Sequence, residues 1–257
     1  MPPLRIALLH LAPRLGDLLY NRRLLATAVT AAAGLGAAWV LTPELCVCGY
    51  DFVDSLGTAW IVPPPDPWMA SICQLAACLR VTVFLSHPEQ DQQTEKRYNT
   101  LFVIAADGRI IGKHRKINAL SGAEGWSSPG ESVAPVPVSP VGQVGLLICA
   151  DAYSPGIATS LKAQGAQLLV SAAAWGPGFH GPSGEWERCS RDTGLPLLVC
   201  NRTGIDRTLS FTKAESVVVK DGQRLVAFTS ECSTIFMIDW DVERQEVATW
   251  ESQRVDL

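Results

Sequence analysis

The chain has 257 residues, 47% of them hydrophobic and 18% charged, which is typical of a globular protein and excludes a disordered or coiled-coil chain. Its 21 basic and 25 acidic residues give a net charge of −4, so no nucleic-acid partner is expected. With only four histidines we expect no histidine-rich metal site, and no GxGxxG or GxxxxGK[ST] nucleotide motif occurs.

The N-terminal residues lack the pattern of an export signal, because Arg5 interrupts the first apolar run. The apolar stretches are too short, or too broken by Gly, Pro and charge, to predict a membrane-spanning helix. Most of the eight cysteines lie within apolar runs, as buried free thiols do. With no export signal, we expect reduced thiols and a cytoplasmic protein, and the short apolar stretches predict no membrane partner.

The first half of the chain alternates strands and helices. In chain order we expect a strand over 4–11, a helix over 17–34, a strand over 38–42, a helix over 68–79 and a strand over 82–86. Strands over 100–105 and 109–113 flank Asp107-Gly108, a turn signal typical of a β-hairpin. Residues 120–140 are rich in Gly, Ser and Pro and are expected to form a loop.

The second half continues this alternation. We expect a strand over 144–148, a helix over 156–164, a strand over 167–172, a helix over 184–193 and a strand over 197–200. A hairpin over 215–219 and 225–229 and a last strand over 234–238 complete the elements. The pattern predicts an α/β fold with mixed strands. No linker interrupts it, so we expect a single domain over 1–257.

Two candidate chemical groups stand at the ends of expected strands. Cys149 follows strand 144–148 and precedes a helical stretch, whose dipole would favour its thiolate; alternatively it is a small buried hydrophobe. Glu44 closes strand 38–42, where a carboxylate is costly unless it is paired or catalytic. The alternative for Glu44 is a surface acid in a turn.

Two further candidates lie between these positions. Lys116 ends the basic run Lys113-His114-Arg115-Lys116, which is either a solvated face or a source of an ammonium that stabilises an oxyanion. Glu124 lies in an aromatic, glycine-rich loop and is either a site residue or a turn acid. Cys46 and Cys48 lack the paired spacing of structural zinc ligands, so we expect no metal.

Together these positions resemble the nitrilase superfamily of carbon–nitrogen hydrolases. The matching stretches, in order, are PELCVCGY (43–50), GKHRKINAL (112–120), AEGWSSPG (123–130) and GLLICADAYSP (145–155). Tyr98-Asn99-Thr100 and Asn201-Arg202-Thr203-Gly204 support the match, which covers nearly the whole chain. Gly156 departs from the glutamate that many members have there, so no substrate is carried over from a particular branch.

The resemblance implies an α/β fold of four layers, an αββα sandwich with two mixed β-sheets. It implies that Cys149 is the nucleophile and Glu44 the general base. Lys116, with the backbone N–H of Ala150, would stabilise the oxyanion, and Glu124 would help to position the substrate and Lys116. No cofactor is implied, and the partner is a small molecule. Such folds usually pair, so we expect a homodimer or larger homo-oligomer, with residues 243–257 as an interface arm.

We expect hydrolysis of a small linear amide through a cysteine thioester, releasing ammonia and a carboxylic acid. Asp151 resembles the amidase and carbamoylase branches, whereas His114-Arg115-Lys116 resembles nitrilases, so N-carbamoyl amide and nitrile hydrolysis remain alternatives. A catalytically idle binding or scaffold protein is an alternative of another class. The substrate-binding residues that we predict, against the alternative of simple packing, are Trp126, Ala150, Trp175, Phe179 and His180.

Overall fold

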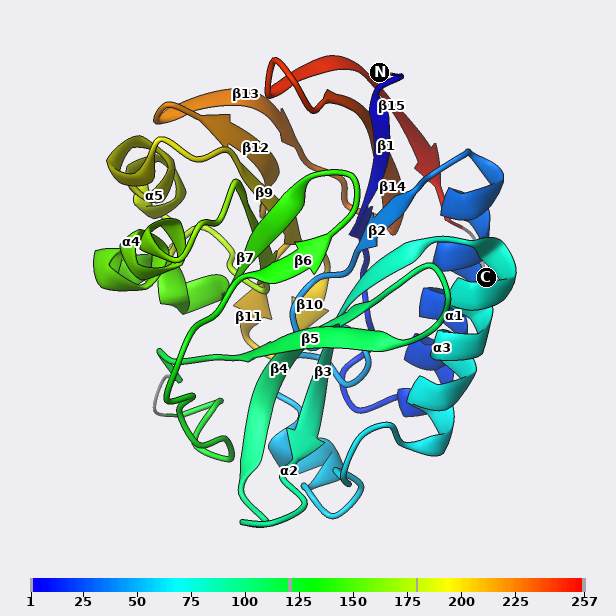
Figure 1. Ribbon diagram of the computed structural model, residues 1–257. Coiled ribbons are helices and arrows are strands. Elements are labelled where there is room, and N and C mark those ends of the chain that lie inside the picture. Colours follow the sequence, from blue (N-terminus) through cyan, green and yellow to red (C-terminus); the bar gives the residue numbers. More distant parts are fainter. Residues whose placement is uncertain (1, 120–121, 179, 256–257) are drawn as a thin grey trace.

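Two β-sheets lie face to face, with helices on the outer side of each (Figure 1). The structure is a computed structural model that describes residues 2–119, 122–178 and 180–255. Helices α1 (Leu18–Gly34) and α3 (Pro67–Leu79) cover one sheet, and α4 (Pro155–Ala163) and α5 (Glu185–Thr193) cover the other. The expectation of a four-layer αββα sandwich is therefore confirmed.

The first sheet is mixed and has the spatial order β15-β14-β1-β2-β3-β4-β5. The central pairs β1–β2 and β2–β3 are parallel, and the outer pairs are antiparallel. The strands are β1 (Leu4–His10), β2 (Trp39–Leu41), β3 (Thr82–Gln90), β4 (Arg97–Ile104), β5 (Ile110–Arg115), β14 (Thr234–Asp241) and β15 (Glu246–Arg254).

The second sheet is also mixed, with the order β13-β12-β9-β8-β7-β6. Its parallel core consists of β7, β8 and β9, with antiparallel neighbours on both sides. The strands are β6 (Val136–Val138), β7 (Gly142–Ile148), β8 (Leu168–Ala173), β9 (Leu197–Asn201), β12 (Ser216–Lys220) and β13 (Gln223–Phe228).

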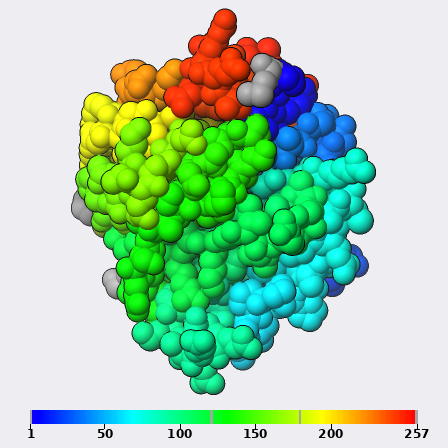
Figure 2. All heavy atoms as spheres, in the orientation of Figure 1, coloured from blue at the N-terminus to red at the C-terminus, as the bar shows by residue number. Residues whose placement is uncertain are grey.

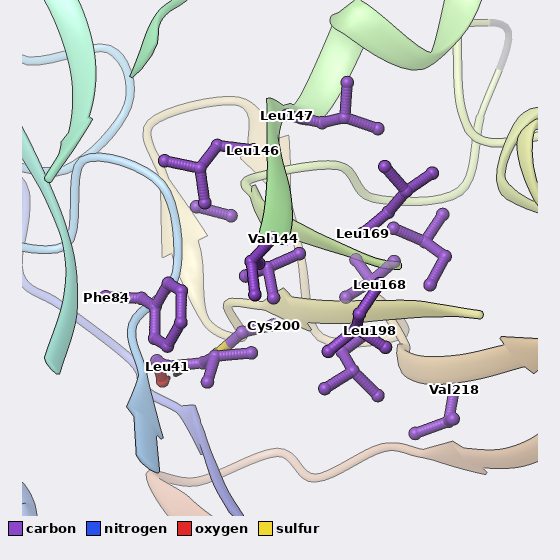
Figure 3. Close-up of a cluster of buried hydrophobic side chains, with 14 of the residues drawn as sticks. Leu41, Phe84, Val144, Leu146, Leu147, Leu168, Leu169, Leu198, Cys200 and Val218 are labelled. Carbon is purple, nitrogen blue, oxygen red and sulfur yellow. Dashed lines mark hydrogen bonds between the residues drawn. The ribbon is translucent and has the colours of Figure 1, made fainter. Parts of the chain in front are cut away.

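The main core lies between the two sheets (Figure 3). Leu41 and Phe84 of the first sheet pack with Val144 and Leu146 of the second, and all four side chains are fully buried. The outer faces of the central strands are buried as well, because the helices cover them. Burial on both faces explains why these strands appear in the sequence as continuous apolar runs rather than as alternating patterns.

Some elements differ from the sequence-based expectations. Strand β6 lies inside the expected loop 120–140, and its three residues become a strand only by pairing with β7. A small hairpin of β10 (Ile205–Asp206) and β11 (Leu209–Ser210), the short helix α2 (Val53–Leu56) and the 3-10 helix η1 (Cys149–Tyr153) were not expected either. These elements are too short to carry a periodic signal.

The C-terminal residues form an edge strand rather than a free arm. β15 pairs with β14 in the same chain, and Arg5 of β1 forms an ion pair with Glu251. Trp250 remains 56% exposed, and its ring packs edge-on against that of Phe228, with 5.2 Å between the ring centroids. In the space-filling view these residues form one end of the molecule, beside the N-terminal strand (Figure 2). Among the described residues, no helix has the length and apolarity to cross a membrane.

The fold brings several strand ends to one place. Glu44 follows β2, Lys116 follows β5, Cys149 follows β7, and Ala174 follows β8. Ligand sites of α/β proteins form at the carboxyl ends of strands, where the loops diverge. Both sheets contribute to this edge, so the site depends on how they are stacked.

Candidate active site

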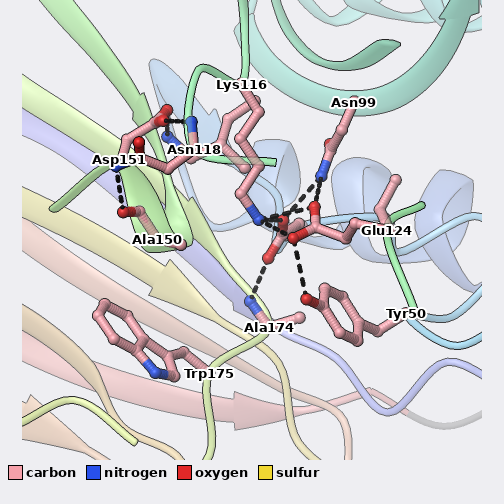
Figure 4. Close-up of polar contacts among 12 residues, drawn as sticks. Tyr50, Asn99, Lys116, Asn118, Glu124, Ala150, Asp151, Ala174 and Trp175 are labelled. Carbon is pink, nitrogen blue, oxygen red and sulfur yellow. Dashed lines mark hydrogen bonds and ion pairs between the residues drawn. The ribbon is translucent and has the colours of Figure 1, made fainter. Parts of the chain in front are cut away.

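Glu44, Lys116 and Cys149, the catalytic residues that the sequence predicted, lie together at this edge. The Lys116 ammonium lies 2.7 Å from Glu44 Oε1, and both side chains are completely buried (Figure 4). Cys149 is buried beside them, and the interaction of its thiol with Glu44 acts to lower the pKa of that carboxyl. A nucleophile, a carboxylate and an ammonium within hydrogen-bond reach form a set that can carry out acyl transfer.

Glu124 is the second carboxylate on the same ammonium. Both of its oxygens lie 2.7 Å from Lys116 Nζ, and it is fully buried. Asn99 joins the two acids, since its amide nitrogen donates to Glu44 Oε1 at 2.8 Å and to Glu124 Oε1 at 3.0 Å. Tyr50 donates its hydroxyl to Glu124 Oε2 at 3.0 Å. Glu124 is therefore buried among the candidate catalytic groups and is not a surface turn acid.

Asn99 and Tyr50 are site residues that the sequence reasoning did not select. Both lie in the stretches that carried the resemblance, and Asn99 is a polar residue within a buried strand. A buried amide on a strand needs a partner, because an unsatisfied polar group costs free energy. That requirement was the available signal, but the sequence does not show which partner meets it.

The charges at the site are unbalanced. Burial alone would lower the pKa of Lys116, but attraction to Glu44, the Cys149 thiolate and Glu124 raises it well above its usual value. Burial raises the pKa of Glu44, opposed by attraction to Lys116. One ammonium therefore faces two carboxylates. The excess of acid provides a group that can accept a proton while Lys116 remains charged.

Burial opposes the stabilisation of the Cys149 thiolate that we expected from a helix dipole. Burial raises the pKa of Cys149 well above its usual value, and the neighbouring Glu44 carboxylate raises it further, opposed by Lys116. The five residues of η1 provide only a short helix N-terminus to offset this. The thiol is protonated at neutral pH, and its proton must be removed during the reaction.

We expect the alkylation rate of Cys149 by iodoacetamide to rise about tenfold per pH unit from pH 7 to pH 9, because only the thiolate reacts. The raised pKa predicts no plateau in this range. Peptide mapping by mass spectrometry measures the rate at Cys149, and the exposed Cys78 provides the comparison with a solvated thiol. A plateau below pH 8 would show that the resting thiol has a low pKa.

Asp151 connects the nucleophile turn to the loop that follows Lys116. Its fully buried carboxylate accepts hydrogen bonds from the backbone N–H groups of Ile117 at 3.0 Å, Asn118 at 2.9 Å and Ile148 at 2.9 Å. His114 Nε2 lies 2.7 Å from the other face of this carboxylate. The donors and His114 outweigh the effect of burial and lower the pKa of Asp151. Asp151 thereby fixes Lys116 relative to Cys149.

The backbone of Cys149 lies at φ 46°, a left-handed conformation that is rare for a residue with a side chain. Asn118 secures the turn, since its amide donates to Ala150 O at 2.9 Å and to Ser154 Oγ at 2.8 Å. Strained backbone persists only where the surroundings hold it in place. The Asp151 and Asn118 contacts are the local restraints that do so.

Asp151→Asn is expected to lower kcat by about 10²-fold with a smaller change in KM, because displacement of catalytic groups by about 1 Å has effects of this size. The amide nitrogen of Asn cannot accept the bonds from His114 or Ile148. Steady-state kinetics measures both constants, and the exposed Asp192→Asn is the matched control. Unchanged kcat in a folded variant would exclude the positioning role.

The loop after β8 provides a second support for the site. The N–H of Ala174 donates to Glu44 Oε2 at 3.0 Å, so both oxygens of this carboxylate are held. Asn201 at the end of β9 then fixes Trp175, accepting from its N–H at 3.0 Å and donating to its carbonyl at 2.9 Å. Gly176 approaches β11 so closely that a Cβ would lie 2.5 Å from Ser210 O. These contacts bring the β10–β11 hairpin against the site.

A cavity of about 430 Å³ opens on Cys149. Of the predicted substrate-binding residues, Ala150, Trp175 and His180 line it. Trp126 instead packs edge-on against Phe52 at 5.1 Å and is not among the residues that line this cavity. Phe179 lies outside the described residues.

The remaining walls come from residues that the sequence did not indicate. They are Tyr50, Tyr153, Ala174, the glycines and proline of 176–178, Gly181 and the hairpin residues Thr208, Leu209, Ser210 and Phe211. Tyr153 is anchored over the cavity because its hydroxyl donates to His180 O at 3.0 Å. Across residues 2–119, 122–178 and 180–255, no three His, Cys, Asp or Glu residues are grouped so that they could hold a metal ion.

Comparisons with known proteins identify the family of the chain. A family model described as carbon–nitrogen hydrolase matches residues 5–250. The probable nitrilase C965.09 of Schizosaccharomyces pombe is 24% identical over 245 residues, which cover 93% of this chain and 89% of that relative.

Solved structures show the same fold. Saccharomyces cerevisiae Nit3 superposes with a TM-score of 0.79 at 23% identity, covering 92% of this chain and 89% of that chain. A mutant amidase from Nesterenkonia sp. AN1, in complex with butyramide, has a TM-score of 0.78 at 25% identity, covering 93% and 91% of the two chains. Another mutant of that amidase carries acrylamide added at its active-site cysteine. Because the family model matches nearly the whole of this chain, the chain belongs to the carbon–nitrogen hydrolase family of the nitrilase superfamily.

Proposed function

We propose that the protein hydrolyses small linear amides through a thioester on Cys149, releasing ammonia and a carboxylic acid. The observation that carries the proposal is that Cys149, which lines one cavity, is buried beside the Glu44–Lys116–Glu124 cluster. The retention of all these groups argues against an idle binding protein. The amidase from Nesterenkonia, which is described with butyramide and with acrylamide, supports an amide as the substrate.

In the first half-reaction, the Cys149 sulfur attacks the amide carbonyl carbon while Glu44 takes the thiol proton. The C–S bond forms and the carbonyl oxygen becomes an oxyanion, which Lys116 and the backbone N–H of Ala150 stabilise. When the oxyanion collapses, the C–N bond breaks and Glu44 returns its proton to the nitrogen. Ammonia leaves, and the acyl group remains on sulfur as a thioester.

In the second half-reaction, water attacks the thioester while Glu44 takes a proton from it. The C–S bond then breaks, the carboxylic acid leaves, and the thiol regains its proton from Glu44. One carboxylate thus acts as base and acid in both steps, a role in general catalysis that typically contributes ~10²–10⁴-fold. Glu124 keeps Lys116 charged and oriented throughout.

The first test is ammonia release from a panel of short amides, N-carbamoyl amines and nitriles, with wild type and Cys149→Ala. We expect release from butyramide with the wild type and loss of at least about 10⁴-fold with the variant, since removing a nucleophile has effects of this order. Preferred turnover of a nitrile or a carbamoyl compound would reassign the substrate class. No ammonia from any compound would favour the binding or scaffold alternative.

A further inference from the structure

The walls of the cavity contain no ionic side chain that could pair with a charged substrate. Among the described residues that line it, none is Lys, Arg, Asp or Glu. The walls consist largely of aromatic rings, small residues and Leu209, with hydroxyls from Thr208 and Ser210. At about 430 Å³, the cavity is near the small end of the range for ligand sites, which indicates a small and largely apolar ligand.

The guanidinium groups of Arg202 and Arg188 are engaged in other contacts. Arg202 is fully buried in a two-bond pair with Asp206, 2.6 and 2.9 Å long, and Phe211 covers it with its ring centroid at 4.5 Å. Arg188 donates to the carbonyls of Ala152 and Tyr153 at 3.0 and 3.3 Å. Neither residue lines the cavity.

Two other cationic side chains, Lys116 and Arg207, are also paired with acids and do not supply a cation to the cavity. Lys116 does not line the cavity and is held by Glu44 and Glu124, so the cluster has an excess of negative charge when both acids are ionised. Arg207 in the hairpin is shared by Asp51 and Asp54. The positions outside the described residues are Met1, Leu120, Ser121, Phe179, Asp256 and Leu257, and none carries a basic side chain.

We propose that the site selects amides whose acyl chain ends in an uncharged group and rejects amides whose acyl chain ends in a carboxylate. A carboxylate in this cavity would lose its hydration, find no cation and face the excess acid of the catalytic cluster. An alkyl or alkenyl chain instead gains from contact with the aromatic walls. This selectivity rests on the proposed amide hydrolysis and narrows its substrate class.

Butyramide and succinamic acid form a matched pair for the test, because the terminal methyl of one is replaced by a carboxylate in the other. Initial rates of ammonia release are measured for both at pH 8.5. We expect kcat/KM for succinamate to be at least about 10²-fold lower, as expected for an unpaired buried charge.

The outcomes separate the two proposals. Comparable kcat/KM for both compounds would overturn the selectivity and leave amide hydrolysis intact. Hydrolysis of succinamate in preference to butyramide would likewise overturn the selectivity. Absence of ammonia from both compounds and from the wider amide panel would overturn amide hydrolysis, and the selectivity would fall with it.

Leu209→Arg supplies the missing cation at the cavity wall. We expect it to raise the ratio of kcat/KM for succinamate to that for butyramide by at least about tenfold, while Leu209→Gln, similar in polarity but uncharged, does not. Leu225→Arg is the positional control, because Leu225 lies on β13 with 39% exposure, close to the 37% of Leu209. An unchanged ratio in folded Leu209→Arg would contradict the charge explanation, and Thr208→Arg repeats the test at the neighbouring wall position.

Discussion

Glu44→Gln is expected to reduce amide turnover by at least about 10³-fold and to trap the acyl-enzyme. Gln has nearly the same shape and can still accept a bond from Lys116, but it cannot take a proton from the thiol or from water. The measurement is intact-protein mass after mixing at pH 9 with 4-nitrophenyl butyrate, whose good leaving group needs no acid and which reacts with the fraction of thiolate that forms at this pH without Glu44. We expect one butyryl group per chain, with decay much slower than in the wild type.

Two controls make this result specific. Cys149→Ala in the Glu44→Gln background should carry no adduct, which identifies the sulfur as the acylated atom. Glu231→Gln, at an exposed position, should behave as the wild type. Release of the butyryl group from Glu44→Gln at the wild-type rate would show that another group activates the water.

Lys116→Met is expected to abolish activity and to destabilise the fold by about 3–5 kcal/mol, the range for removing one partner of a buried ion pair. The variant leaves Glu44 and Glu124 facing each other, both bonded to the single amide nitrogen of Asn99. It also removes the attraction that opposes the raised pKa of Glu44. Thermal unfolding and ammonia release measure the two effects.

The loss of stability in Lys116→Met should depend on pH. A buried carboxyl whose folded pKa is raised stabilises the fold below its unfolded pKa, and this contribution is lost as pH rises through the folded pKa. The difference in Tm between wild type and variant should therefore widen from pH 5 to pH 8. Lys162→Met, on the exposed face of α4, should show no such trend. A difference in Tm that does not change with pH would mean that Lys116 does not hold down the pKa of these carboxyl groups.

Much of the fold could be predicted from the sequence. Buried strands such as β7 and helices such as α1 appear as apolar runs and as helical spacing, and Asp17 caps α1 by accepting from Tyr20 N, as predicted. Strand β6 and the β10–β11 hairpin could not be predicted in this way, because their strands are very short and each is defined only by its pairing with a neighbouring strand. A strand of two or three residues has no periodicity to detect.

The sequence by itself determined the family and the order of Glu44, Lys116, Glu124 and Cys149 along the chain, because motifs and their order can be recognised in a single sequence. Only the tertiary structure decided that these groups meet, that Asn99 and Tyr50 join them, and that Trp126 packs away from the cavity.

The protonation state of the Cys149 thiol also depends on the tertiary structure. The sequence suggested a helix dipole acting on the thiol, whereas burial and a neighbouring carboxylate raise its pKa. Burial and through-space charge depend on the stacking of two sheets and on loops distant in sequence. Local sequence therefore specified which chemical groups are present, and long-range packing specified their protonation states and the charge of the pocket that receives the substrate.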